Sequence, residues 1–540
     1  MAHTDRFEGN SLAKEKVILS TFIALDDFCS VCSGDKDVEL APDIWNKVEK
    51  SYASLAQCID EKRVVYGITT GFGPLANRLM STENIQDLQR NLIYHLATGV
   101  GEPLNWQAAR AVMLDRLVSI TRGWSGASMA LVELIVRCLN YGLAPWVPQK
   151  GTVGASGDLT PCAHMALALM GEGAFITPQG YKQPAKETLA LLDLTPFSLE
   201  GRDGLALVNG TSAMSGIAAL NHKSAKQLLE WSVKLSVSHA ELLQGQAEAW
   251  HPEFAIARPH MGQSLITSRL NEYIRSSQLI QKERLSNTYI SDIFEQTDNA
   301  TEVHKIEVPP QDPYTIRCVP QILGAVHDMI DFHERMVETE INSTTDNPLF
   351  QTEAPYALHG GNFYGQHVAF ASDALKTALI KIAILAERQV ACLTDEKLNK
   401  GLPAFLQPNT TGLHSGFMGA QVTATALLAE LRSSAHPVSI QSIPTNGNNQ
   451  DVVSMGTIAA RSTDSILHDI FRILAIQALC VSQAMDLLIE GKVPGRRQYE
   501  LSEFSETAQS VREFTRGKAD FLDQDRPLSD DIETIAEEMI

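Results

Sequence analysis

The sequence predicts a mainly α-helical fold, an elongated helical bundle with a smaller mixed α/β region before it. The first observation is length, because four segments in the second half keep the helical spacing of apolar residues well past the usual length of a helix. The second is a contrast, because residues 171–204 are broken by Gly and Pro, which is typical of turns and short strands. The long helices are expected at 211–243, 317–342, 365–393 and 453–490.

We divide the chain into three regions. Residues 1–16 are polar and lack an apolar run, so we expect a flexible N-terminus and neither a secretion signal nor a transit peptide. Residues 17–205 form the mixed N-terminal region, and residues 206–540 form the long-helix bundle with its C-terminal helices. The length of 540 residues also favours more than one packed region, because a single core usually stops growing well below that size.

Shorter helices follow from the same apolar spacing. Ile44, Val48 and Leu55 recur at helical intervals after Pro42, which suits a first helical turn. The acidic C-terminal stretch is interpreted as an amphipathic helix. The shorter helices are expected at about 42–58, 108–121, 128–141 and 529–538.

Composition excludes several classes of function. The chain has 44 Lys and Arg residues against 64 Asp and Glu residues, a net charge of -20, which argues against a nucleic-acid or anionic-membrane surface. Apolar stretches such as 374–385 are interrupted by lysines too soon for a membrane span. Eight cysteines spread from Cys29 to Cys480 suit a reducing cytoplasm better than a disulfide framework. Cys29 and Cys32 have C-x-x-C spacing, but no second pair and no nearby His completes a metal site.

The stretch Gly151-Thr-Val-Gly-Ala-Ser-Gly-Asp-Leu-Thr-Pro161 can carry unusual backbone chemistry. Because Gly157 has no side chain, its amide nitrogen can reach the Ala155 carbonyl carbon and close a five-membered ring with loss of water. Ser156 then eliminates its hydroxyl and leaves an exocyclic methylene, which is an electrophile. Thr160 and Pro161 are expected to cap and begin a helix whose positive end stabilises negative charge on the ring oxygen. The alternative is an ordinary Gly-rich turn before a helix, in which no ring forms.

This context resembles the aromatic amino-acid lyase family, whose members build a methylidene-imidazolone (MIO) group from Ala-Ser-Gly. The family includes ammonia-lyases for histidine, phenylalanine and tyrosine, together with related aminomutases. The resemblance covers most of the chain. The further matching blocks are Tyr66-Gly-Ile-Thr-Thr-Gly-Phe-Gly-Pro-Leu75, Asn91-Leu-Ile-Tyr-His-Leu-Ala-Thr-Gly99, Leu205-Ala-Leu-Val-Asn-Gly-Thr-Ser-Ala-Met214, Asp312-Pro-Tyr-Thr-Ile-Arg-Cys318, Thr345-Asp-Asn-Pro-Leu349, Gly360-Gly-Asn-Phe363 and Asn449-Gln-Asp-Val-Val-Ser-Met455.

The resemblance implies a fold like that of the histidine and phenylalanine ammonia-lyases. It also implies an MIO group formed from Ala155, Ser156 and Gly157, with no external cofactor and no metal. The expected assembly is a homotetramer whose active sites mix residues of several subunits. The sequence has no Gly-rich phosphate loop, no H-E-x-x-H motif and no serine-hydrolase elbow, so phosphoryl transfer, metallohydrolysis and triad chemistry lack support.

Site roles follow from the same resemblance. Tyr66, on a Gly-rich lid loop, is expected to take the β-proton as a phenolate, and Gly73 to let the lid pack closely. Asn209 is expected to hydrogen-bond the ring oxygen, although a helical Asn is more often a satisfied core group. Arg317 is the candidate for the substrate carboxylate, with an inter-helix salt bridge as the alternative. The further pocket or support positions are Tyr314, Phe363, Asn347, Gln321, Asn446 and Gln450.

The substrate prediction depends on a few positions. Histidine lyases typically carry Ser-His at the place of His95 and Leu96, and a glutamate at Gln450, so histidine is disfavoured. The His95-Leu96 pair resembles that of bacterial tyrosine ammonia-lyases, and a buried His95 would pair with a phenol. We therefore expect deamination of L-tyrosine to p-coumarate and ammonia, with slower use of L-phenylalanine. Alternatives are a phenylalanine ammonia-lyase, an aminomutase, a histidine lyase and a helical scaffold with a degenerate site.

Overall fold

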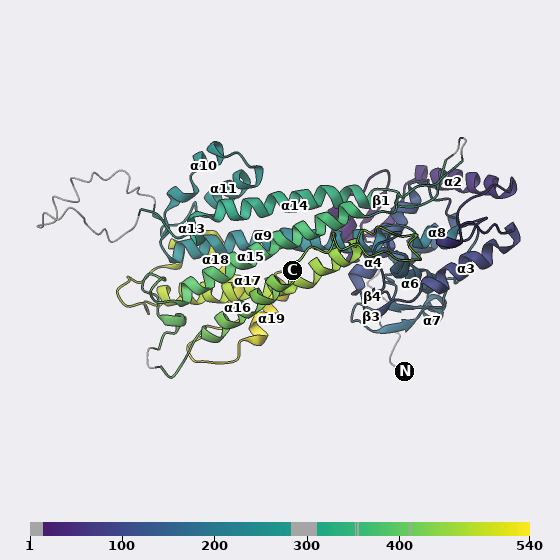
Figure 1. Cartoon of the computed structure of the whole chain (residues 1–540). Coiled ribbons are helices and arrows are strands. Elements are labelled where there is room, and N and C mark those ends of the chain that lie inside the picture. Colours follow the sequence, from purple (N-terminus) through teal and green to yellow (C-terminus); the bar gives the residue numbers. More distant parts are fainter. Residues whose placement is uncertain (1–13, 282–309, 352, 354–355, 410–411) are drawn as a thin grey trace, which may run out of the picture. The chain divides into compact units, whose positions relative to one another are not determined.

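The computed structural model describes residues 14–281, 310–351, 353, 356–409 and 412–540. The fold is mainly helical, as the sequence predicts (Figure 1). Contacts divide the chain into two compact units, and each unit is assembled from three segments. The first unit comprises residues 1–223, 332–374 and 436–464, and the second comprises residues 224–331, 375–435 and 465–540.

Each predicted region is one continuous stretch of sequence, whereas each of the two units combines segments that are far apart in sequence. The predicted boundary at residue 205 therefore stays a prediction. Of the expected flexible N-terminus 1–16, residues 1–13 lie outside the described residues, and Lys16 already belongs to the first strand.

The first unit holds the short strands that the broken N-terminal sequence indicates. Within the described residues these strands form two-stranded pairs: β1 with β2 is parallel, and β3 with β4, β5 with β6 and β7 with β8 are antiparallel. Their bounds are β1 Lys16–Leu19, β2 Asp37–Leu40, β3 Val100–Pro103, β4 Pro148–Lys150, β5 Ala174–Ile176, β6 Lys182–Pro184, β7 Leu349–Phe350 and β8 Ala357–Leu358.

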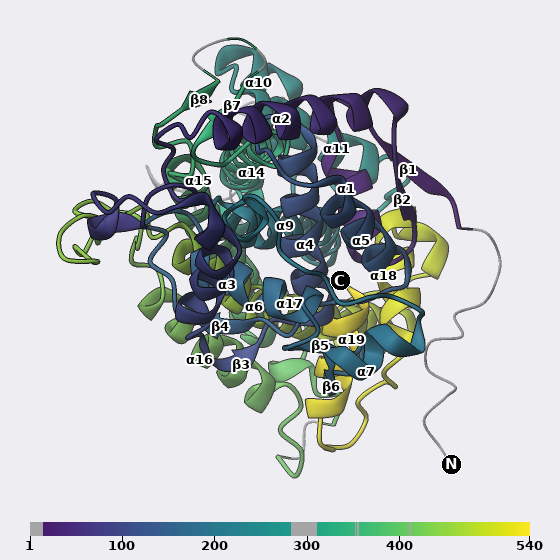
Figure 2. The same ribbon diagram turned by 90° about the vertical axis from the view of Figure 1, so that its right-hand side faces the viewer.

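Helices build the core of the first unit. Helix α4 is buried on all sides and contacts α1, α2 and α5 (Figure 2), while α3, α6 and α8 contact one another. The helices that lie within this unit are α1 Leu25–Cys32, α2 Pro42–Asp60, α3 Ile85–Leu96, α4 Trp106–Thr121, α5 Met129–Asn140, α6 Leu159–Leu169, α7 Ala185–Leu191 and α8 Asp203–Val208, with the short 3-10 turns η1 Gly73–Leu75 and η2 Thr82–Asn84.

The expected start of α6 was wrong by two residues. The helix begins at Leu159 with Asp158 at the N-cap position, so Thr160 and Pro161 already lie inside its first turn. Asp158 does not cap its own helix. Its carboxylate accepts hydrogen bonds from the backbone N–H of Met214 at 2.7 Å and from the hydroxyl of Thr457. Contacts from distant segments therefore fix this helix start, and local sequence does not reveal them.

Four long helices run through both units along the chain (Figure 1). The predicted long helices are confirmed, with ends that differ by three residues or fewer from those expected. Proline fits within α14 because Pro320 stands in its first turn, where no intrahelical N–H bond is lost. The bounds are α9 Ser212–Leu242, α14 Val319–Ile341, α15 Gln366–Thr394 and α17 Gly456–Ile489.

The second unit packs the long helices around one apolar core. Leu228, Leu323, Leu379 and Leu474 each come from a different long helix and all four side chains are buried in the same cluster. The remaining elements are η3 Ala247–Trp250, α10 Pro252–Ala257, α11 Met261–Tyr273, α13 Tyr314–Arg317, η5 Ala404–Leu406, α16 Met418–Ser433, η6 Leu501–Glu503, α18 Glu506–Arg516 and α19 Ser529–Glu538.

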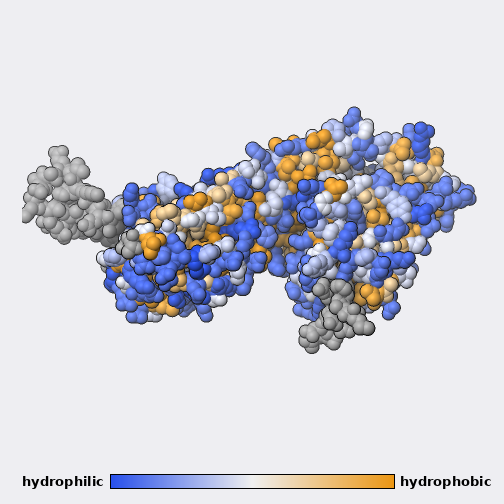
Figure 3. Space-filling view, turned by 90° about the horizontal axis from the view of Figure 1, so that it is seen from below, coloured by the Kyte–Doolittle hydropathy of each residue, from blue (hydrophilic) through white to orange (hydrophobic). Residues whose placement is uncertain are grey.

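Helix α17 is the one described helix that is long and apolar enough to cross a membrane. Its most apolar window is 89% buried inside the protein, which is typical of a core helix. Polar residues dominate the surface seen in Figure 3, and apolar patches lie among them.

Candidate active site

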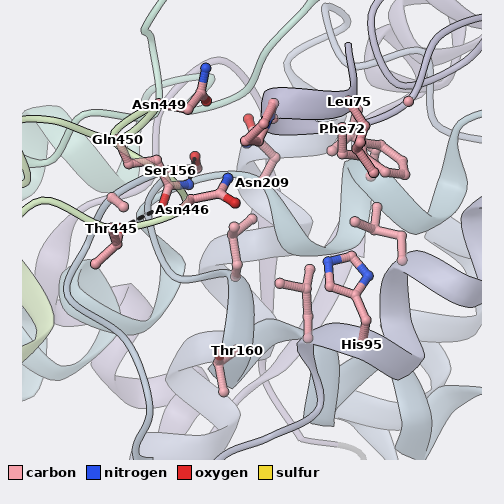
Figure 4. A pocket seen from close by; sticks show the side chains of 18 of the residues that line it. Phe72, Leu75, His95, Ser156, Thr160, Asn209, Thr445, Asn446, Asn449 and Gln450 are labelled. Atoms are coloured by element: carbon pink, nitrogen blue, oxygen red, sulfur yellow. Dashed lines mark hydrogen bonds between the residues drawn. The ribbon is translucent and has the colours of Figure 1, made fainter. Parts of the chain in front are cut away.

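A cavity of about 740 Å³ lies in the first unit (Figure 4). It gathers the ring-forming tripeptide, the lid-loop tyrosine and the His-Leu pair, although these are up to 91 positions apart in the sequence. Of the described residues that line it, none carries a Lys, Arg, Asp or Glu side chain. The predicted site residues that line this cavity are Tyr66, Gly73, His95, Leu96, Ala155, Ser156, Gly157, Asn209, Asn446 and Gln450.

The Ala155-Ser156-Gly157 turn is tight, and its surroundings fit a backbone ring. Ala155 and Gly157 form an isolated β-bridge with each other, and Gly157 forms a second β-bridge with Gly210. Gly157 has a φ of +71°, and a Cβ atom there would lie 2.0 Å from the carbonyl oxygen of Gly210. No side chain is therefore tolerated at the position whose nitrogen would close the ring.

Asn209 presents a buried amide to the cavity, and Figure 4 shows this amide beside Ser156. Its backbone is extended at the end of α8, so it is not the mid-helix residue that the sequence indicated. Among the described residues, its side-chain oxygen has no hydrogen-bond partner. Because amide oxygen and nitrogen are interchangeable assignments, the amide can turn its N–H toward a ring oxygen. This unused polar group suits the implied MIO group.

Three helices begin beside the turn. α6 starts at Leu159, α9 at Ser212 and α17 at Gly456, and the Asp158 carboxylate connects them through its bonds to Met214 and Thr457. Helix N-termini carry partial positive charge, so they favour negative charge nearby. Burial nevertheless raises the pKa of Asp158 to about 6, and burial also raises the pKa of the neighbouring Asp115 to about 7.

Tyr66 lies at the start of the lid loop and is half-buried. Its phenol oxygen accepts a hydrogen bond from the backbone N–H of Gly73 at 2.9 Å, and its ring meets that of Phe72 edge-on at 6.1 Å. This donor fixes the position of the phenol oxygen beside the cavity. Gly73 has a φ of +53°, and a Cβ atom there would lie 2.5 Å from the side-chain nitrogen of Asn446. The lid loop therefore needs glycine at this contact.

His95 lies on the last turn of α3 with its side chain exposed, so the expected burial is wrong for the single chain. Its Nδ1 lies 3.0 Å from the carbonyl oxygen of Asn91. A carbonyl can only accept, so Nδ1 is the donor in this contact, and in a neutral ring Nε2 then has the lone pair. The ring can thus accept a hydrogen bond in the cavity, where Figure 4 shows it on the side of Phe72 and Leu75.

Gln450 links the ring-forming turn to a third segment. Its side-chain N–H donates to the Ser156 hydroxyl at 3.2 Å, and its oxygen accepts from the Thr445 hydroxyl at 2.7 Å. These two contacts hold the Gln450 amide between the hydroxyls of Ser156 and Thr445. The loop that carries Gln450 is therefore ordered against the turn (Figure 4).

The remaining predicted residues do not line this cavity. Arg317 and Gln321 line a second cavity of about 560 Å³ in the second unit, and Tyr314 lies next to them, with the Arg317 guanidinium 4.5 Å from the centre of its ring. Among the described residues no carboxylate pairs with Arg317, so the expected alternative of a salt bridge is not found. Phe363 is half-buried outside both linings, and the side chain of Asn347 accepts from the Gly360 N–H at 2.6 Å.

Sequence reasoning missed several residues of the first cavity. Phe72 packs against Tyr66, and its signal was present as the second aromatic residue of the Gly-rich loop. Asn449 and Thr445 also line the cavity, and both stand beside residues that the sequence did single out. Asp158 stood within the quoted eleven-residue stretch, but nothing local indicates its burial among three helix starts.

Comparisons with known proteins identify the family of this chain. Residues 23–510 match the model of the family described as aromatic amino acid lyase. The chain is 46% identical over 528 residues to a tyrosine ammonia-lyase of Cereibacter sphaeroides, with 98% of each chain covered. It is 38% identical to a probable histidine ammonia-lyase of Thermoplasma acidophilum over 96% of each chain.

A solved structure of an aminomutase has a similar fold. The tyrosine aminomutase of Streptomyces globisporus superposes with a TM-score of 0.90 at 33% identity, covering 97% of this chain and 96% of that one. This protein is therefore similar both to ammonia-lyases and to an aminomutase. The chain belongs to the aromatic amino acid lyase family, and its activity is that of an ammonia-lyase or aminomutase of that family.

Proposed function

We propose that this protein is a tyrosine ammonia-lyase, which converts L-tyrosine to p-coumarate and ammonia and uses L-phenylalanine more slowly. The observation that carries the proposal is the 3.0 Å contact between His95 Nδ1 and the Asn91 carbonyl oxygen, which leaves Nε2 as the other nitrogen of a ring that lines the cavity. With Nδ1–H donating to Asn91, Nε2 is left as an acceptor at the cavity. A phenol O–H is the matching donor, and phenylalanine has none. The 46% identity to a tyrosine ammonia-lyase supports the same choice.

The reaction further requires an MIO group formed from Ala155, Ser156 and Gly157. The tight turn, the room for glycine alone at Gly157 and the unused amide of Asn209 support its formation. Once formed, this group supplies an electrophile that makes the substrate's amine a better leaving group. Asn209 would donate to the ring oxygen, and the helix starts around Asp158 would favour negative charge there.

Tyr66 is proposed as the base that removes the β-proton. The hydrogen bond from the Gly73 N–H to its phenol oxygen orients the lone pairs of that oxygen. Phe72 limits the rotation of the ring by edge-on contact. Proton removal by an oriented phenolate and departure of the activated amine then complete the elimination.

The substrate carboxylate requires a cation, and the described lining of the first cavity has none. Arg317 offers a guanidinium without a carboxylate partner in the second cavity, together with Gln321. We propose that Arg317 of another copy of the chain binds the carboxylate, so that a homotetramer builds each site. Exposed apolar side chains on the single chain support such an assembly, and they include Phe370, Leu398, Leu413, Val422, Ile440, Ile443 and Val452.

The His95→Phe variant tests the substrate. It removes the acceptor and supplies an apolar wall, so kcat/KM for tyrosine relative to phenylalanine should fall about three- to tenfold. This is less than burial of His95 would predict, because water can reach an exposed ring. Tyr94→Phe is the matched control, because Tyr94 is the neighbour of His95 on α3. Its hydroxyl donates to Glu172 at 2.7 Å. An unchanged ratio in His95→Phe would remove the support for tyrosine.

Product analysis separates the lyase from the aminomutase, which the solved aminomutase structure keeps as a second candidate. Tyrosine, phenylalanine and histidine are offered separately to the purified protein. A lyase should release ammonia and a cinnamate that absorbs in the near ultraviolet. A β-amino acid without such absorbance would instead identify an aminomutase.

A further inference from the structure

The backbone N–H of Tyr66 has a partner from far along the chain. It donates to Nε2 of His359 at 3.1 Å, across 293 positions of sequence. The amides on either side, those of Val65 and Gly67, donate to threonine hydroxyls within the loop itself. Of these three consecutive amides, only that of Tyr66 is held by another segment.

His359 must present a lone pair for this contact. An imidazole nitrogen accepts only when it carries no proton, so the ring is neutral with its proton on Nδ1. His359 is exposed in the structure, and the desolvation that its ring does undergo lowers its pKa from its ordinary value, which favours the neutral ring.

A buried ion pair supports the segment that carries His359. Arg202 donates to both carboxylate oxygens of Asp346, at 2.8 and 2.5 Å, and both side chains are fully buried. Arg202 also donates to the carbonyl oxygen of Asn347 at 2.7 Å, and the Asn347 side chain accepts from the Gly360 N–H at 2.6 Å. These bonds fix the backbone next to His359.

We propose that His359 is a positioning residue for Tyr66. The lid-loop tyrosine is then held at both ends, by His359 at its backbone and by the Gly73 N–H at its phenol oxygen. Fixing both ends keeps the phenol oxygen at one place in the cavity, and proton transfer is sensitive to that place. The inference rests on the proposed function, because it requires Tyr66 to be the base.

The test compares two variants of His359 with a matched control. His359→Leu removes the acceptor, whereas His359→Gln keeps an acceptor oxygen at similar reach. His414→Leu is the control, because the His414 ring likewise accepts a backbone N–H, that of Asp525 at 3.2 Å, in the second unit. The full-length variants are measured for kcat, KM and the isotope effect with β-deuterated tyrosine. Their melting temperatures and the water loss of the 155–157 peptide are measured by calorimetry and mass spectrometry.

We expect His359→Leu to lower kcat about two- to tenfold, with KM nearly unchanged and a larger isotope effect, because removal of the β-proton becomes slower. His359→Gln should recover most of the rate, and His414→Leu should match the unmodified protein. Unchanged kcat in His359→Leu, or an equal loss in His359→Gln, would overturn the proposal. An equal isotope effect throughout would also overturn it, since a purely structural role leaves that effect unaltered.

Tyr66→Phe separates this inference from the proposed function. If Tyr66→Phe is inactive while His359→Leu behaves like the unmodified protein, the positioning role of His359 fails and the base assignment stands. If Tyr66→Phe keeps most of its activity, Tyr66 is not the base, and both proposals fall together.

Discussion

The two cavities that hold predicted site residues differ in the chemistry that they offer. The first is neutral in its described lining and holds the Ala155-Ser156-Gly157 turn with the Tyr66 phenol. The second carries Arg317, and acidic residues such as Glu248 and Asp312 also line it. An amino-acid substrate needs both a reactive centre and a partner for its carboxylate. Neither cavity alone therefore offers both a reactive centre and a carboxylate partner. We expect substitutions in the first cavity to act on kcat and substitutions in the second to act on KM.

The largest expected effect is that of Ser156→Ala in the first cavity. Without a hydroxyl to eliminate, no methylene electrophile forms, and kcat should fall at least about a thousandfold. Circular dichroism should show an intact fold, and the 155–157 peptide should not show the loss of the serine-derived water that creates the methylene in the unmodified protein. Borohydride should inactivate the unmodified protein in the same assay. Substantial turnover by Ser156→Ala would remove the electrophile from the mechanism and revive the scaffold alternative.

Arg317→Met tests the other half of the comparison. Loss of a bidentate carboxylate partner should raise KM about ten- to a hundredfold, while the 155–157 peptide still shows its loss of water. Arg269→Met is a suitable control, because Arg269 pairs with Glu230 at 3.2 Å on the surface of the same unit. A KM that stays constant in Arg317→Met would separate the second cavity from substrate binding.

Mixed assemblies decide whether the two cavities serve one site from different copies. Tyr66→Phe is expected to be nearly inactive, and Arg317→Met to turn over little at a substrate concentration far below its raised KM, so the two chains are produced together and assayed at such a concentration. If each site takes Tyr66 from one copy and Arg317 from another, random assembly leaves about a quarter of the sites intact. No recovery of activity would show that both residues of a site come from the same chain.

The smallest expected effect concerns the buried acids beside the first cavity. Because burial raises the pKa of Asp115 to about 7, the folded chain keeps a proton that the unfolded chain releases near pH 4. The contribution of Asp115 to stability is therefore complete at low pH and is lost as the pH rises through about 7. Asp115→Asn stays neutral, so its melting temperature relative to the unmodified protein should rise between about pH 5 and pH 8. A pH-independent difference would contradict the burial of a titrating Asp115.

Sequence reasoning predicted the helices well because apolar spacing is a local property. The helix expected at 529–538 is α19 with the same ends, and the helix expected at 128–141 is α5, Met129–Asn140. The start of α6 failed because Asp158 bonds to Met214 and Thr457, which belong to other segments. Local patterns do not carry such contacts.

The site shows the same limit. Motifs predicted that Tyr66, Ser156 and Asn209 act together, and these residues line one cavity. They did not predict that Arg317 lines another cavity, because a motif gives the identity of a residue and not its place in three dimensions. His359 went unnoticed because its contact with Tyr66 spans 293 positions and has no pattern of its own.

The contacts around the Ala155-Ser156-Gly157 turn set an order of events during synthesis. The Ser454 hydroxyl donates to the Gly154 carbonyl at 3.1 Å, and the Met455 N–H donates to the Val153 carbonyl at 2.9 Å. A ribosome makes Ser454 300 residues after it has made Gly154. A nascent chain therefore cannot form these contacts around the turn until it is nearly finished. An electrophile whose formation depends on the contacts would appear late. Unfinished chains would then carry no reactive group that attacks other molecules in the cell.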